Sequence, residues 1–319
     1  MKATVSQDFK TIFRISRQIY QEQPLLKQYV WRQVRIDILT FALILTFIGL
    51  GFFTLPLLPT DLMRTIAAGV VAVVFVYVAT LINRSNYARM LITADSSLRG
   101  EVLKARDVEQ VMVKRRGLLA KWVALDLSVA ALTASLRKID DTVPFLGSIL
   151  SIIGDAVWQT VSFFSLTIIV LHGEEPLASV KASASAVKET WKQGKLRYGF
   201  GGLFQSAISL IAMIVIFVLG MGAVAGVIAL ILSGLADAVV LTDVAKRALM
   251  VGVGVTAVPV LAFLSYFSYV VQAHYAVWHV ALYRFAVHKD YVGVFPRELL
   301  EKAVEPVEKR GLFRRKVAS

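Results

Sequence analysis

The sequence predicts an all-α fold: a polytopic transmembrane helix bundle of about six spans, with amphipathic interfacial helices on its cytoplasmic side. Hydrophobic residues make up 57% of the chain and charged residues only 18%, a more apolar mixture than water-soluble packing can bury. The apolar residues form continuous blocks of about 18 or more, long enough to cross a hydrocarbon core of roughly 30 Å. Lipid requires every backbone polar group to be paired internally, which leaves helices or a closed barrel. Because apolar and polar residues do not alternate within these blocks, helices are favoured over a barrel.

Six apolar blocks are predicted to span the membrane, and the third is the weakest because Lys121 and Asp126 interrupt it. The blocks cover residues 38–58, 65–82, 118–136, 145–171, 200–235 and 248–283. With all six spanning and the N-terminus inside, the cytoplasmic segments hold 29 of the 35 Lys and Arg residues, as the positive-inside rule expects. If the third block did not span, the basic segment 172–199 would lie outside, so the third block is counted.

The predicted organisation has three parts. Residues 1–37 form a basic, amphipathic cytoplasmic lead-in, residues 38–283 form the membrane domain, and residues 284–319 form a basic cytoplasmic tail. Segments 84–117 and 172–199 are cytoplasmic and helical. The lead-in is too long and too charged for a cleavable leader, so we expect a multi-pass protein of the plasma or inner membrane with both termini in the cytoplasm. The last two blocks exceed one bilayer thickness, which leaves an eight-span alternative open.

Two cytoplasmic segments have the pattern of interfacial helices. In the first, apolar residues recur at helical spacing and Lys10, Arg14 and Arg17 lie off their face; the apolar set is Phe9, Ile12, Phe13, Ile19 and Tyr20. In the second, the stripe is Leu177, Val180, Ala184, Val187 and Trp191. Periodicity is equally compatible with both faces packing as ordinary core.

Cations beside the second stripe and in the tail are candidates for contact with anionic lipid. Long lysine stems lie along apolar surface while their ammonium groups reach phosphate, and each cation near the surface contributes about 1 kcal/mol. The candidates are Lys181, Lys188, Lys192, Lys195, Arg314, Arg315 and Lys316. The positive-inside topology already accounts for the net charge of +13, so no nucleic-acid partner is needed to explain it.

Two carboxylates, Asp126 and Asp155, fall inside predicted spans at similar depth. An acid there costs about 2.5–3.5 kcal/mol on insertion scales and is a functional candidate. Asp155 belongs to a polar stripe of Ser148, Ser151, Asp155, Gln159, Ser162 and Ser165. If the two acids met, they would share a proton and form a proton or cation relay. We favour interhelical hydrogen bonding instead, since the sequence offers no evident basic or metal-binding partner.

Small residues and absent motifs complete the prediction. Gly222 and Gly226 form a small-xxx-small motif that suits close helix packing, within the chain or between copies. The chain has no cysteine and four histidines without metal-ligand spacing, and it has no nucleotide-binding loop, nucleophile elbow or zinc motif. We therefore predict no catalytic residue, no metal and no cofactor, and expect a homo-oligomer or a subunit of a membrane complex.

A longer run resembles a family of uncharacterised prokaryotic six-span membrane proteins. It contains L-L-A-K-W, A-L-T-A-S-L, G-D-A-V-W-Q-T-V-S-F-F and V-L-H-G-E-E-P-L-A-S-V-K between Leu118 and Trp191, with F-K-T-I-F-R-I-S-R near the N-terminus. The architecture is also similar to membrane portions attached to glycerophosphodiester-cleaving domains. Family members often have a proline near the end of the fourth span, where this chain reads S-L-T-I-I-V-L. The resemblance implies fold and topology, not an activity.

These observations lead to one preferred function and two alternatives. We expect a non-enzymatic membrane scaffold that organises lipid or partners through its basic cytoplasmic helices. The first alternative is a transporter or channel that uses Asp126 and Asp155. The second is a lipid-processing membrane enzyme, for which the sequence shows no nucleophile or metal cluster.

Overall fold

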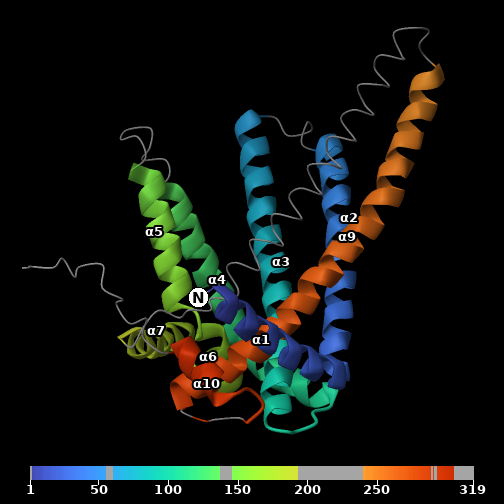
Figure 1. The fold of residues 1–319 in the computed structure, drawn as a ribbon. Helices are drawn as coiled ribbons and strands as arrows, with labels where there is room; N and C mark the ends of the chain where they lie inside the picture. The colour runs from blue at the N-terminus through green and yellow to red at the C-terminus, as the bar shows by residue number, and fades with distance from the viewer. Residues whose placement is uncertain are drawn as a thin grey trace, which may run out of the picture. The chain divides into compact units, whose positions relative to one another are not determined.

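The chain is helical, as the computed structural model shows for residues 2–54, 60–136, 146–192, 240–288, 290 and 293–304. No strand occurs in these ranges, so the predicted all-α class is confirmed for them. In order, the helices are α1 (Lys2–Glu22), α2 (Pro24–Thr54), α3 (Asp61–Leu98), α4 (Ala105–Leu136), α5 (Leu146–Val161), α6 (Ser165–His172), α7 (Pro176–Lys192) and α9 (Val240–Tyr283), followed by the π-helix η3 (Arg284–His288) and α10 (Arg297–Val304) (Figure 1).

Local sequence explains where several helices begin and end. Pro24 is the first residue of α2, a position where its missing N–H costs nothing. Thr60 caps α3, because its Oγ1 accepts a hydrogen bond from the Met63 N–H at 3.2 Å. Gly173 ends α6 in the left-handed conformation, with φ of 76°, and its N–H donates to the Ile169 carbonyl at 2.9 Å.

Among the described residues, three segments are long and apolar enough to cross a membrane: α3, α4 and residues 150–172. The first two contain the second and third predicted spans, and the last covers residues 150–171 of the fourth. The most apolar stretch of α3 has none of its residues buried, which is far more exposed apolar surface than a water-soluble helix presents. The first predicted span lies in α2 as far as Thr54, and the sixth lies within α9. The fifth, and residues 55–58 of the first, lie outside the residues that the structure describes, so the count of six stays a prediction.

The fourth predicted span is not one continuous helix. A turn at residues 162–164 divides it into α5 and α6. At the break, the Phe164 backbone N–H donates to the Ser183 hydroxyl of α7 at 2.9 Å. No proline lies at the break. Instead, a side chain from another helix takes the place of the helical hydrogen-bond acceptor, and this interrupts the helix.

By contacts, the chain divides into two units, each with its own packing. The first comprises Met1–Lys27, Gly69–Tyr198 and Ala273–Ser319, and its described core includes Leu91, Leu119, Phe164 and Trp278, all at most 2% exposed. The second comprises Gln28–Ala68 and Gly199–Gln272. There the rings of Trp31 and Tyr266 lie 4.9 Å apart, and the Tyr269 hydroxyl donates to Asp37 at 3.4 Å.

The apolar face of α1 packs against protein. Ile12, Ile19 and Tyr20 are buried, and the rings of Phe13 and Tyr20 lie 4.9 and 5.1 Å from the ring of His274 in α9. Lys10, Arg14 and Arg17 point to the exposed side. For these residues the core-packing alternative describes the structure, and contact of α1 with lipid stays a prediction.

Candidate functional site

Helix α7 packs through a face of small residues that only partly overlaps its predicted apolar stripe, with Val187 common to both. Ser179 and Ser183 are completely buried, and Ala186 and Val187 are nearly so. Leu177, the first residue of the predicted stripe, is instead 67% exposed. Small side chains allow two helices to approach closely, and the buried Ser183 hydroxyl accepts the Phe164 hydrogen bond described above. Hydropathy found Val187 in this face but missed the two serines, because serine carries no apolar signal.

The opposite face of α7 presents two lysines. Lys181 and Lys188 are both exposed and lie seven residues apart, or about 10 Å along the helix axis at ~1.5 Å per residue. Lys192 ends the helix, and its side chain lies outside the described part, as do Lys195, Arg314, Arg315 and Lys316. Two of the seven predicted lipid-contact cations can therefore be placed, and both are accessible.

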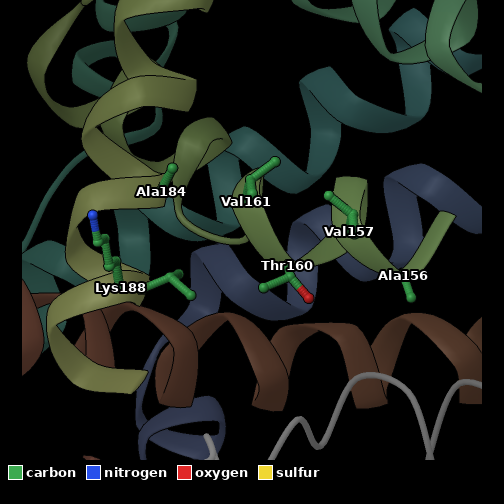
Figure 2. Close-up of a pocket in the computed structure, with 7 residues that line it drawn as sticks. Ala156, Val157, Thr160, Val161, Ala184 and Lys188 are labelled. Atoms are coloured by element: carbon green, nitrogen blue, oxygen red, sulfur yellow. The ribbon is translucent and has the colours of Figure 1, made fainter. Parts of the chain in front are cut away.

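A groove of about 480 Å³ lies between α5 and α7. Figure 2 shows the residues of α5 along one side and those of α7 along the other. The lining is Ala156, Val157, Thr160 and Val161 from α5, with Ala184, Val187 and Lys188 from α7. The Thr160 hydroxyl and the Lys188 ammonium are the only polar side-chain groups among these seven, so the groove offers apolar walls and one positive charge.

Asp126 has a basic partner, contrary to the expectation from sequence. Its carboxylate lies 3.2 Å from an Arg84 guanidinium nitrogen of α3 and accepts a hydrogen bond from the Trp158 indole of α5 at 2.8 Å. The Trp158 ring stacks on Trp122 with centroids 5.8 Å apart. Lys121 pairs with Glu175 at 3.0 Å and not with Asp126. Asp126 of α4 thus links α3 and α5 through side-chain hydrogen bonds, in agreement with the interhelical hydrogen bonding favoured above. Its partner Arg84 is 42 residues away in the sequence.

The polar stripe around Asp155 does not face a single environment. Ser151 and Ser165 are fully buried, Asp155 and Ser162 are half-buried, and Gln159 is exposed. No hydrogen bond joins Asp126 to Asp155 in the part of the chain that the structure describes. Gly222 and Gly226 lie outside that part.

A second polar cluster, which sequence reasoning missed, surrounds Asp95 in α3. Its carboxylate, 5% exposed, accepts hydrogen bonds from Arg284 Nε at 2.7 Å and from Arg99 at 2.8 Å. Arg284 also pairs with Asp290. Burial lowers the pKa of the Arg284 guanidinium, but the hydrogen bond and charge of Asp95 outweigh it, so the pKa lies above its ordinary value. A pair 189 residues apart leaves no signal in local spacing.

Histidines gather beside this cluster. The rings of His172 and His288 lie 5.3 Å apart, and His288 Nε2 is 3.2 Å from the Tyr283 hydroxyl. Among the described residues, no three His, Asp or Glu side chains converge in a way that could hold a metal ion. The cluster therefore ties α3, α6 and η3 together and offers no evident ligand set for a metal.

No family model matches this chain. No curated protein and no solved structure matches it either. The resemblance to six-span membrane proteins accordingly stays a prediction, and function must be argued from the chain's own geometry.

Of the described arrangements, the surface formed by the groove and the two α7 lysines is the one open to a ligand. The Asp126 and Asp95 clusters have partners of opposite charge within the protein, and such pairs hold helices together. The groove and the lysines instead present apolar walls and exposed positive charge, with no carboxylate among the seven lining residues that the structure describes. Apolar walls beside a positive charge complement an anionic amphiphile, which has an apolar chain and a negative headgroup.

Proposed function

We propose that this chain is a non-enzymatic integral membrane protein that organises anionic lipid at the cytoplasmic face of the cell membrane. In this proposal the protein crosses the membrane six times, with both termini inside, and assembles as a homo-oligomer or as a subunit of a membrane complex. The observation that carries it is the pair of exposed lysines, Lys181 and Lys188, on a helix that follows directly after a segment apolar enough to span.

The electrostatics of a bilayer surface support this reading. A lysine near an anionic leaflet contributes about 1 kcal/mol, and the attraction falls within a Debye length of roughly 8 Å at physiological salt. Lys181 and Lys188 have exposed side chains, so their ammonium groups can reach phosphates. The transporter alternative has less support, because Arg84 and Trp158 already occupy the Asp126 carboxylate.

Lipid titration of the purified full-length protein tests the proposal. We expect phosphatidylglycerol to bind more tightly than phosphatidylcholine of the same chain length. The double variant Lys181→Gln with Lys188→Gln should weaken phosphatidylglycerol binding about tenfold or more, at roughly 1 kcal/mol per lysine, and added salt should reduce the wild-type preference.

The matched control is Lys10→Gln with Lys114→Gln, which removes the same charge from exposed positions on α1 and α4. This control should retain most of the preference for phosphatidylglycerol. Equal affinity for the two lipids, or a preference that salt leaves unchanged, would contradict the proposal.

A further inference from the structure

We propose that the groove between α5 and α7 is a binding site for one anionic glycerophospholipid, with an acyl chain along the groove and the phosphate on Lys188. The inference rests on the proposed function and gives it a defined site, ligand class and stoichiometry.

The shape of the groove comes from small residues on its facing walls. Ala156 lies on the α5 side and Ala184 on the α7 side, as Figure 2 shows. Longer side chains at these positions would extend into the space between the helices. The volume of about 480 Å³ falls within the range of roughly 300–1,000 Å³ typical of small-molecule sites. The groove is thus large enough for a ligand, and carbon dominates its walls.

The position of the groove places it next to lipid. Its α5 residues belong to the segment 150–172, which is apolar enough to span, and α7 lies across the end of α5 (Figure 1). The neighbouring side chains Ile153, Val157 and Leu177 are exposed apolar residues. In a membrane such surface meets acyl chains, so bilayer lipid is the occupant available at the highest concentration.

The charge of the groove selects among lipids. Acyl chains gain little free energy by leaving other acyl chains for an apolar wall, since lipid tails are as apolar as leucine. The walls therefore position a chain, and the headgroup decides which lipid stays. Lys188 supplies one positive charge at the groove and none of its seven described lining residues is acidic, while Lys181 lies two turns away on the exposed face of α7. An anionic phosphate fits this arrangement, and a zwitterionic headgroup brings a positive charge close to Lys188.

Filling the groove without changing charge tests the site. Ala184→Leu adds three carbon atoms inside the groove, whereas the matched control Ala178→Leu adds them to an exposed position of the same helix that does not line it. Native mass spectrometry of the full chain, released from detergent containing phosphatidylglycerol, counts the retained lipids. We expect one saturable phosphatidylglycerol on the wild type and on A178L, and at least a tenfold loss of retention on A184L.

A second variant approaches the groove from its other wall. Ala156→Leu changes an exposed residue of α5, so it tests the site even if A184L does not fold. Retention of the lipid by both A184L and A156L at the wild-type level would overturn the groove site, while the lysine variants still report on the proposed function. Equal retention of phosphatidylcholine and phosphatidylglycerol by the wild type would overturn both proposals.

Discussion

Asp126 shows how a single carboxylate inside an apolar helix is stabilised by partners that are remote in the sequence. Its side chain is 21% exposed, and its partner Arg84 is 44% exposed. The Trp158 indole adds a hydrogen bond at 2.8 Å. Hydrogen bonds to a charged group are stronger than neutral ones, so these two partners help Asp126 to hold α3, α4 and α5 together.

The two intramembrane acids should therefore differ in their effect on stability. We expect Asp126→Asn to lower the free energy of unfolding by about 1–3 kcal/mol, because it weakens two charge-assisted hydrogen bonds in a part-buried site. Asp155→Asn should change it by less than about 0.5 kcal/mol, since Asp155 is half-buried and makes no hydrogen bond to Asp126 in the described residues. Unfolding in sodium dodecyl sulfate, followed by circular dichroism, measures both.

The exposed pair of Lys121 and Glu175, with side chains 63% and 61% exposed, provides the control. Lys121→Gln should have little effect, as expected for surface ion pairs. If D155N proved as destabilising as D126N, or abolished a pH-driven ion flux in proteoliposomes, the relay alternative would regain support.

At the scale of elements, the connection between α6 and α7 sets the position of α7. Gly173 adopts a positive φ, and the Arg115 guanidinium lies against it so closely that an added Cβ would be 1.8 Å from Nη1. The connection thus combines a left-handed backbone with a close approach by a side chain of α4. Both requirements favour glycine.

Two glycines of similar conformation allow these requirements to be separated. Gly100 has a φ of 74° and no atom within 4 Å of an added Cβ, so Gly100→Ala should cost only about 1–2 kcal/mol for the left-handed backbone. Gly173→Ala should cost more, because Arg115 must also move. Thermal unfolding in detergent measures the difference, which should disappear when Arg115→Ala is added to both variants. If the difference in cost between Gly173→Ala and Gly100→Ala were the same in the Arg115→Ala background as in the wild type, the close-approach explanation would be contradicted.

At the scale of the whole molecule, every functional proposal depends on the side of the membrane on which the segments predicted to be cytoplasmic lie. The chain contains no cysteine, so single cysteines can be introduced without background. Val102, in the loop between α3 and α4, is 84% exposed, and Ser185 is an exposed residue of α7. Both lie in segments predicted to be cytoplasmic, whereas Leu62, 70% exposed, lies in a predicted outer loop.

Labelling of intact cells with an impermeant maleimide tests this topology. We expect Leu62→Cys to react from outside, and Val102→Cys and Ser185→Cys to react only after the membrane is permeabilised. Reaction of V102C and S185C from opposite sides would show that α4 and the following segment do not cross as predicted, and α7 could not then bind lipid at the cytoplasmic face.

The sequence by itself determined the helical class and three apolar segments of membrane length, because block length and continuous hydropathy are local properties of the chain. It also identified Lys181 and Lys188 as exposed candidates, since their spacing follows from one helix. For the described residues of α1, periodicity found the apolar face but could not tell whether lipid or protein covers it.

Only the tertiary structure decided which residues meet. Arg84 and Asp126 are 42 residues apart, and Asp95 and Arg284 are 189 apart, so no local pattern encodes their contact. The break between α5 and α6 depends on a hydroxyl from α7. Helix α7 packs through the buried Ser179 and Ser183, whose value in close helix packing lies in their small size and not in their hydropathy. The groove is lined by residues of both α5 and α7, so neither helix alone defines it.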